Sequence, residues 1–406
     1  MPRKTRASVL LLFLAAALAL APVHGGQGAP EAVRPAASFS PPYNVSSSAG
    51  ANSTSAHVVR AADGTLHAVW QEGGRPAYAQ GTGPTWQPWE WIVPPGEPGY
   101  SGPALAVDGS GNVHVALVQG DAPHLLVYTS RPASGTWTVP IPLSLPAYSS
   151  TCPAIAVDGT GGVWVAWQTE LADTNAEIYA RYRPAGGAWD PLQRVTENAA
   201  QDQRPSLAVG SGDIAHLAWR SSAAGVYDIL YSRFAGGTWA PAVNLSETGF
   251  YSVDPDVAAD GAGNVYVVWA DEMGALDHFQ ILFRRWDGSA WLPWTYLSLP
   301  SATRALDPAL AADSAGNLYA VWTDYRDDLW HPEVYFSHST DHGATWLGDE
   351  NLTQNAASSY HPDVAAQPGG YAHIVWEDVS PGQLDILYSR AYAAGLEKCC
   401  LPVVQK

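Results

Sequence analysis

Hydrophobic and polar residues alternate in short segments along this chain, and small turn-forming residues separate one segment from the next. The segment AVDGTGGVWVAWQTE at residues 156–170 returns as AADGAGNVYVVWADE at residues 258–272. A period of two residues indicates half-buried β-strands, and glycine-rich turns between them are typical of antiparallel hairpins. No segment keeps a helical period, so we expect almost no helix.

Tryptophan positions define the length of the repeating unit. A Trp that closes an apolar strand recurs about every fifty residues, a spacing typical of propeller blades. It falls at Trp70, Trp167, Trp219, Trp269, Trp322 and Trp376, with Leu117 in its place in the second unit. Each unit shows four strand-like segments, such as 153–158, 163–168, 229–233 and a last one that begins at a second Trp, as at Trp239. The pattern predicts an all-β, seven-bladed β-propeller of four-stranded antiparallel blades.

The two ends of the repeat region complement each other. The last unit stops after DILYSRAY at residues 385–392 and lacks its fourth strand, whereas FSPPYNV at residues 39–45 matches WAPAVNL at residues 239–245. We therefore expect the N-terminal strand to complete the last blade, which would leave no free sheet edge. The propeller domain is predicted to span residues 38–392.

The segments outside the repeats predict export. Basic residues followed by an apolar run too short to cross a bilayer indicate a signal peptide at residues 1–25, with a linker at 26–37 and a tail at 393–406. The Leu-Pro-containing tail resembles the ends of some exported bacterial proteins. We expect a secreted or cell-surface monomer. The net charge of −18 argues against nucleic acid as a partner, and no later stretch is apolar enough for membrane insertion.

Three cysteines, Cys152, Cys399 and Cys400, do not make a disulfide framework, and the sequence leaves their pairing open.

The segment STDHGATW at residues 339–346 resembles the Asp-box, Ser-x-Asp-x-Gly-x-x-Trp, of the sialidase-like (BNR-repeat) propellers. Shorter versions occur between the third and fourth segments of other units, where that family carries the box. The resemblance implies a propeller in which Ser339, Asp341, Gly343 and Trp346 are structural. The family's Arg-Ile-Pro motif is not found near the start of the chain, so the resemblance does not decide whether the protein has catalytic activity.

Residues that recur in every unit are interpreted as scaffold. Three positions before the marker Trp stand His67, His114, His216 and His373, but other units have Trp or Tyr there, so packing is favoured over metal binding. Several acids follow the marker, among them Glu72, Asp271, Asp324 and Glu377. Clustered carboxylates suit Ca²⁺, yet no DxDxDG spacing is present, and no cofactor or metal is expected.

Loops that depart from the repeat are the better candidates for function. The segment TDYRDDLWHPE at residues 323–333 is the least repetitive of them, and Asp324, Tyr325 and His331 are candidate catalytic residues. The predicted ligand-binding residues are Arg204, Arg304, Arg326, Trp330, Asp271 and Glu377. Carboxylate, Tyr and Arg suit glycoside or uronate chemistry, with the arginines as an anion clamp. The structural alternative is a solvated loop whose acids and arginines pair locally.

Three functions follow from these observations. The first is a secreted propeller that binds a glycan or other surface polymer on its loop face. The second is a carbohydrate-active enzyme, either an exo-glycosidase of the sialidase type or a polysaccharide lyase. The third is an extracellular protein-interaction scaffold. The sequence does not identify the ligand.

Overall fold

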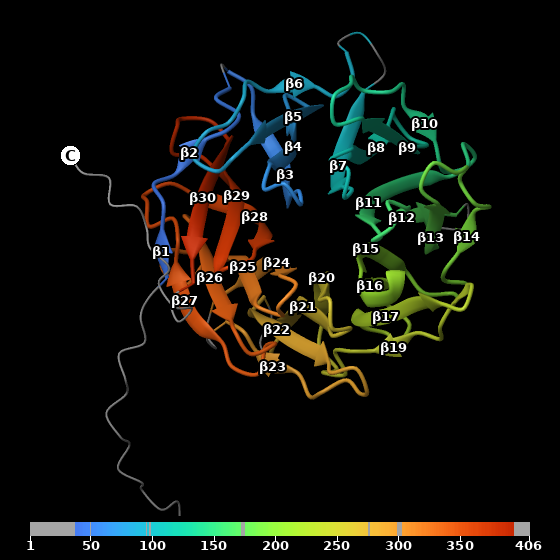
Figure 1. Ribbon diagram of the computed structural model, residues 1–406. Coiled ribbons are helices and arrows are strands. Elements are labelled where there is room, and N and C mark those ends of the chain that lie inside the picture. The colour runs from blue at the N-terminus through green and yellow to red at the C-terminus, as the bar shows by residue number, and fades with distance from the viewer. Residues whose placement is uncertain are drawn as a thin grey trace, which may run out of the picture. The chain divides into compact units, whose positions relative to one another are not determined.

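A computed structural model describes residues 37–393 except 49, 95, 97–98, 172–174, 275–276 and 299–302. Within these residues the chain forms seven antiparallel sheets arranged as a ring of blades (Figure 1), as predicted. No helix in the described part is long and apolar enough to cross a membrane. The predicted signal peptide, most of the linker, and Cys399 and Cys400 in the tail lie outside the described residues.

Each blade is a meander whose first strand is innermost (Figure 1). The innermost strands are β3 (Ser53–Arg60), β7 (Tyr100–Val107), β11 (Ser149–Val157), β15 (Asp202–Val209), β20 (Ser252–Ala259), β24 (Ala305–Ala312) and β28 (Ser359–Gln367). The second strands are β4 (Leu66–Glu72), β8 (Val113–Gln119), β12 (Val163–Glu170), β16 (Ala215–Ser221), β21 (Val265–Glu272), β25 (Leu318–Asp324) and β29 (Tyr371–Asp378). The third strands are β5 (Arg75–Gly81), β9 (Leu125–Arg131), β13 (Ala176–Arg183), β17 (Asp228–Ala235), β22 (Phe279–Trp286), β26 (Glu333–Ser339) and β30 (Asp385–Tyr392).

The outermost strands are shorter than the sequence pattern suggested. They are β6 (Glu90–Trp91), β10 (Ile141–Pro142), β14 (Gln193–Arg194), β18 (Thr238–Trp239), β19 (Val243–Asn244), β23 (Thr295–Tyr296) and β27 (Leu347–Asn351). In the fourth blade the expected strand from Trp239 is broken into β18 and β19 around Pro241. Proline has no N–H to donate to a ladder, so it interrupts the pairing. Among the described residues, helical structure is limited to η1 (Ser211–Asp213), a 3₁₀ turn of three residues.

The N-terminal segment pairs with the last blade. Strands β1 (Ser38–Phe39) and β2 (Tyr43–Asn44) run antiparallel to β30, with Phe39 opposite Ala391 and Tyr43 opposite Tyr388. This is the pairing expected from the match between the two chain ends. It covers the outer edge of β30 and joins the first described residues of the chain to the last.

The marker tryptophans form the core between the blades. All six are at most 1% exposed, and in five of them the indole N–H donates to the side chain two residues later, as from Trp322 to Asp324 at 2.8 Å and from Trp269 to Asp271 at 3.0 Å. Trp219 instead donates to Asp202 at 2.9 Å. A buried N–H needs a hydrogen-bond acceptor, so the polar side chain two residues after the marker Trp has a structural role in these five blades.

The recurring AVDG pattern makes the turn between the first two strands. In Asp260, Oδ1 accepts from the backbone N–H groups of Ala262 and Asn264 at 2.9 and 3.0 Å, and Oδ2 accepts from the Asn264 amide. Asp108, Asp158 and Asp313 make the equivalent bonds. The repeat is therefore explained by side-chain caps on a tight turn.

The recurring histidines pack against tyrosines of the third strands. Nδ1 of His67, His114 and His216 lies 2.7 Å from a Tyr hydroxyl, and Nδ1 of His373 lies 2.8 Å from the hydroxyl of Tyr388. Burial lowers the pKa of His373 to about 3 and that of His216 to about 4. These histidines are neutral core residues, in agreement with the packing interpretation.

The Asp-box-like segment closes the turn between β26 and β27. The Ser339 hydroxyl donates to Asp341 at 2.8 Å and accepts from the Gly343 N–H at 2.9 Å, and Asp341 accepts from the Thr345 N–H at 2.8 Å. The Trp346 ring packs edge-on against Phe283 of the fifth blade, with ring centroids 5.0 Å apart. The segment thus joins two blades, which is a structural role.

Candidate functional site

All seven innermost strands carry a β-bulge at the same place, near their first residues. The ladder to the second strand skips there, for example between Gln203 and Ser206. In each blade one bulge residue has a left-handed backbone, with φ between 42° and 55°. These residues, here called the bulge ring, are Ser55, Gly102, Cys152, Arg204, Asp254, Asp307 and His361. Six are not glycine, and such strain concentrates at functional sites.

Contacts from the preceding blade hold the bulges in place. The Arg204 N–H donates to Oε1 of Gln168 at 3.0 Å, and the Ser55 N–H donates to Oε1 of Glu377 at 2.8 Å. His361 donates in the same way to Thr323 at 3.1 Å. Each acceptor directly follows a marker Trp. Side chains alternate along a strand. The residue one position after the marker Trp therefore accepts from a backbone N–H of the bulge ring, whereas the residue two positions after it accepts from the Trp indole.

Charged side chains gather on one arc of the ring. Arg204 Nη1 lies 2.8 Å from Asp254 Oδ1, and the Arg204 side chain is 54% exposed. His361 Nδ1 lies 3.2 Å from Glu377 Oε1, and its Nε2 lies 3.6 Å from Asp307 Oδ2. We call Arg204, Asp254, Asp307, His361 and Glu377 the bulge cluster.

The electrostatics of the bulge cluster follow from these contacts. The hydrogen bond to Glu377, with help from the charges of Asp307 and Asp254, raises the pKa of His361 to about 8. Burial raises the pKa of Asp307, while the nearby His361 and Arg204 act in the opposite direction. His361 is therefore cationic at neutral pH, and its 56% exposed side chain is accessible to a ligand.

Aromatic rings lie beside the bulge cluster. The Arg304 guanidinium stacks 4.9 Å from the Tyr325 ring, and burial raises the pKa of Tyr325 while the charge of Arg304 lowers it. The ring of Tyr360 lies 6.1 Å from that of His361, and Tyr251, which is 37% exposed, packs edge-on against Tyr227. Polar groups flanked by accessible aromatic faces are a typical lining of small-ligand sites.

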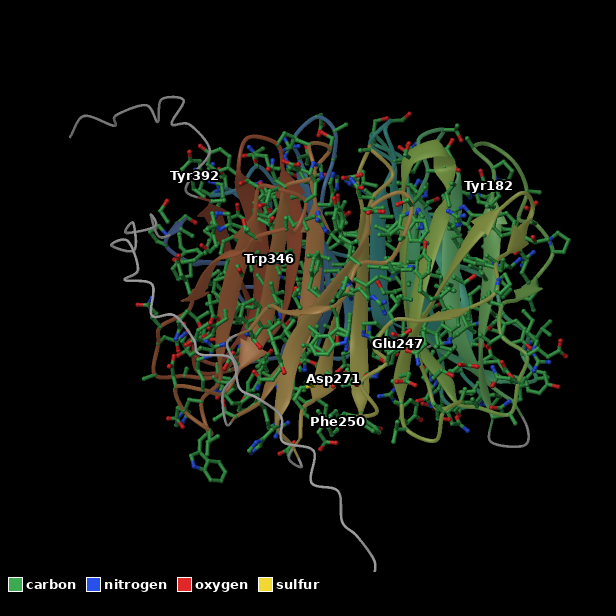
Figure 2. The ribbon with its side chains drawn as sticks, turned by 90° about the horizontal axis from the view of Figure 1, so that it is seen from below. Tyr182, Glu247, Phe250, Asp271, Trp346 and Tyr392 are labelled. Carbon is green, nitrogen blue, oxygen red and sulfur yellow. The ribbon has the colours of Figure 1, made fainter. Side chains whose placement is uncertain are left out.

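Figure 2 shows at which end of the blades the bulge ring lies. Phe250, in the loop before β20, and Asp271, near the end of β21, lie toward one edge of the ring of blades, and Tyr182 and Tyr392 lie toward the other. Bulge residue Asp254 follows Phe250 by four positions, and the Gly-rich turns between first and second strands lie at the far ends of the innermost strands.

The structure places Asp324 and Arg326 in an internal network. Asp324 is 1% exposed and accepts from Trp322, and its Oδ2 lies 2.5 Å from Arg326 Nη2. Arg326 also pairs with Asp349 at 2.7 Å and stacks 4.3 Å from the Tyr335 ring. Every one of these contacts is internal, which favours the structural interpretation of this pair.

Asp271 has a similar environment. It is fully buried and accepts from Trp269 at 3.0 Å, Ser252 at 2.7 Å and Thr248 at 3.0 Å. Burial raises the pKa of its carboxyl group. Asp271 therefore occupies the scaffold position of the fifth blade, where Asp324 stands in the sixth.

The remaining predicted residues divide into two groups. Arg204 and Glu377 belong to the bulge cluster, and Arg304 with Tyr325 lies next to it. Trp330 is 82% exposed, and His331 pairs with Asp328 at 2.8 Å on the same exposed loop. Trp330 and His331 therefore belong to the exposed loop between β25 and β26 and not to the bulge cluster.

Asp254, Asp307 and His361 were expected as loop residues on the candidate face, but the predicted catalytic and ligand-binding residues did not include them. The signal was nevertheless present, because each of these residues directly precedes a proline that recurs in the first strand, as do Gly102, Cys152 and Arg204. The residue before that proline varies between blades while its surroundings repeat. A variable position in a fixed frame is where a repeat protein differentiates its binding surface.

A second layer of polar groups ties the innermost strands together. Asp256 accepts from the Ser206 hydroxyl at 2.6 Å and the Leu310 N–H at 2.8 Å, and burial raises its pKa to about 6. Asp363 accepts from the Val58 N–H at 2.8 Å and faces His57 at 3.6 Å. These bonds bridge neighbouring blades two residues beyond the bulges, and they support the bulge ring.

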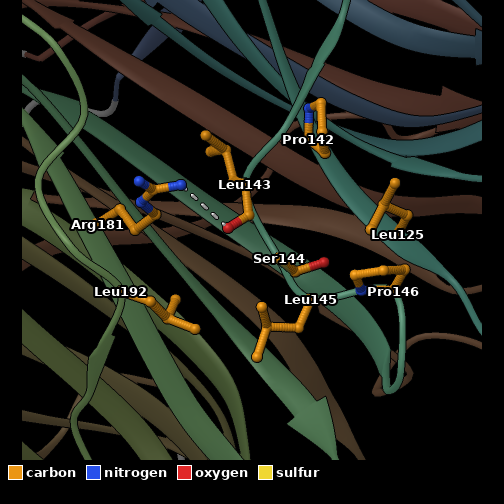
Figure 3. A pocket seen from close by; sticks show the side chains of 8 residues that line it. All are labelled: Leu125, Pro142, Leu143, Ser144, Leu145, Pro146, Arg181 and Leu192. Atoms are coloured by element: carbon orange, nitrogen blue, oxygen red, sulfur yellow. Dashed lines mark hydrogen bonds between the residues drawn. The ribbon is translucent and has the colours of Figure 1, made fainter.

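A separate apolar pocket of about 360 Å³ lies between the second and third blades (Figure 3). Arg181 closes one side by donating to the Leu143 carbonyl at 3.4 Å. Its lining residues are Leu125, Pro142, Leu143, Ser144, Leu145, Pro146, Arg181 and Leu192. None of them belongs to the bulge ring.

Among the residues described, no group of three or more His, Cys, Asp or Glu side chains is arranged to hold a metal ion.

No protein-family model and no curated protein matches the chain. Solved structures do match it. The BP39L lectin from Burkholderia pseudomallei superposes with a TM-score of 0.62 at 13% identity, covering 85% of this chain and 97% of the lectin. An ulvan lyase of family PL25, solved with -[GlcA(1-4)Rha3S]-, gives 0.60 at 12% identity, covering 85% and 95%.

The GH93 α-L-arabinofuranosidase of Fusarium graminearum, in complex with arabinobiose, gives 0.52 at 12% identity over 89% of this chain and 99% of the enzyme. At such identities these likenesses establish the fold alone. The chain therefore shares its β-propeller fold with these proteins, as the Asp-box resemblance implied.

Proposed function

We propose that this protein is an exported propeller that binds a glycan or a related surface polymer at the bulge ring. The observation that carries the proposal is an arc of charged side chains, the exposed Arg204 and His361 with the partly exposed Asp254 and Asp307, held in a strained backbone conformation by the neighbouring blades. Strain of this kind persists only where surrounding structure enforces it, and here it fixes the direction of polar side chains.

The architecture suits the recognition of a polymer. Rigid blades carry the bulge ring, so little conformational entropy is lost when a ligand is ordered against it. Tyr251, Tyr325 and Tyr360 add aromatic surface beside the charged groups. The lectin, the lyase and the glycosidase that share the fold all act on or bind carbohydrate by their names, which is a reason to test carbohydrates first.

A glycan array, run beside assays for product release, tests the proposal. We expect retention of at least one glycan class without release of product, and loss of retention in His361→Gln and Asp254→Asn. The matched control is Asp287→Asn, an exposed acid in the turn after β22. Absence of binding to every glycan would overturn the proposal. Release of product that depends on His361 would instead establish the carbohydrate-active enzyme.

A further inference from the structure

The arginines on the loop face bear on which glycans this site accepts. An anion clamp for a sugar carboxylate needs guanidinium groups that are free to form new charged hydrogen bonds. Arg326 is held between Asp324 and Asp349, at 2.5 and 2.7 Å, with its side chain only 15% exposed. Its charge is neutralised inside the blade.

The other two predicted clamp residues are also paired. Arg304 Nε lies 3.4 Å from Asp277, and its guanidinium covers the Tyr325 ring. Arg204 lies 2.8 Å from Asp254. A sugar carboxylate bound at Arg204 or Arg304 would lie beside a resident carboxylate that already shares the charge of the guanidinium.

The charge balance of the bulge cluster points the same way. Two cationic groups, Arg204 and His361, face three carboxylates, Asp254, Asp307 and Glu377. The whole chain carries a net charge of −18. An acidic polymer therefore meets repulsion at long range and again at the cluster.

Hydroxyl groups meet no such penalty. A sugar hydroxyl donates to a carboxylate and accepts from a guanidinium or an imidazolium. Adjacent acidic and basic side chains therefore satisfy the hydroxyls of a sugar without adding a further negative charge beside the acids.

The bulge ring is also uneven in the length of its side chains. Blades one to three carry the short Ser55, Gly102 and Cys152, so the long polar side chains that contact a ligand come from blades four to seven.

Resting on the function proposed above, we propose that the bulge ring selects neutral, hydroxyl-rich sugar residues over uronates and sialic acids. The selecting groups are Asp254 and Asp307, which are partly exposed, accept from sugar hydroxyls and repel sugar carboxylates, while the buried Glu377 adds negative charge behind His361. Arg204 and His361 orient these acids and donate to ring hydroxyls.

Pairs of ligands that differ only in their carboxylates provide the test. We would measure calorimetric affinities for polygalacturonate, glucuronan and sialylated N-glycans, each beside its carboxyl-reduced form, at low salt. The expected result is at least tenfold tighter binding of the neutral member in each pair that is bound. In Asp307→Asn, affinity for the acidic member should rise several-fold while the neutral member weakens.

The possible outcomes separate the two proposals. Equal or tighter binding of the acidic member overturns the selection of neutral sugars and leaves glycan binding intact. No binding to any pair overturns the selection of neutral sugars, and absence of binding to every glycan of the array overturns both proposals. Thermal unfolding of Asp307→Asn, and of Asp287→Asn as the matched control, checks that the affinity change is not a loss of fold.

Discussion

The replacement Asp324→Ala separates a scaffold role from a catalytic one. This buried carboxylate makes two side-chain interactions: it accepts a hydrogen bond from the Trp322 indole at 2.8 Å, and it forms an ion pair with Arg326 at 2.5 Å. Alanine leaves the Trp322 N–H without its acceptor in a fully buried place, and it leaves Arg326 with Asp349 as its remaining carboxylate partner.

The expected cost follows from these two losses. An unsatisfied buried donor costs about 1–3 kcal/mol, and a lost charged hydrogen bond costs about 1.5–3 kcal/mol. Breaking a buried ion pair gives a similar total, so we expect the free energy of unfolding to fall by about 3–5 kcal/mol. Asp324→Asn keeps an acceptor for the indole and should lose about half as much.

Urea denaturation followed by tryptophan fluorescence measures the change, because stability is obtained from the midpoint and slope of the transition. Asp328→Ala is the control: this carboxylate stands on the exposed loop four residues away, and we expect the midpoint to stay where it is in the wild type. An Asp324→Ala protein as stable as the wild type, especially one that binds or releases glycan differently, would refute the scaffold assignment.

Two further predictions concern the Asp-box-like turn and the bulge ring. Gly343 has φ +77°, and a Cβ there would lie 2.4 Å from Phe283, so Gly343→Ala should lower the free energy of unfolding by about 2–4 kcal/mol. Urea denaturation would measure this, and an unchanged midpoint would show that the turn does not depend on close contact with the fifth blade. Because the pKa of His361 is raised to about 8, chiefly by Glu377, its contribution to stability is complete below pH 6.5 and is lost as pH rises through 8. An NMR titration should find the pKa of His361 near 6.5 in Glu377→Gln; a pKa that stays near 8 would exclude Glu377 as the main cause.

Much of the fold could be predicted because repeats reveal themselves by self-comparison. The Trp spacing fixed the number of blades, and the match of residues 39–45 to 239–245 indicated how the ring closes. The fourth strands were less predictable, since their prolines interrupt pairing without changing the hydrophobic pattern.

The candidate site was less predictable for a physical reason. Asp271, Asp324 and Glu377 all stand just after a marker Trp, but a shift of one position along a strand turns a side chain to the opposite face. Asp271 and Asp324 therefore serve the Trp indoles, whereas Glu377 reaches Ser55 and His361 in neighbouring strands. The left-handed bulges depend on contacts between blades, and a pattern read along one strand does not contain those contacts.

Hydrogen exchange of the glycan complex, followed by mass spectrometry, tests most directly where ligand binds. With the tightest ligand from the array, we expect added protection in peptides that contain the first residues of β15, β20, β24 and β28, together with the loops before them. We expect none in the turns that follow Asp158 or Asp260 at the far ends of the blades. Protection confined to residues 327–331, or to those far turns, would contradict the placement of the site at the bulge ring.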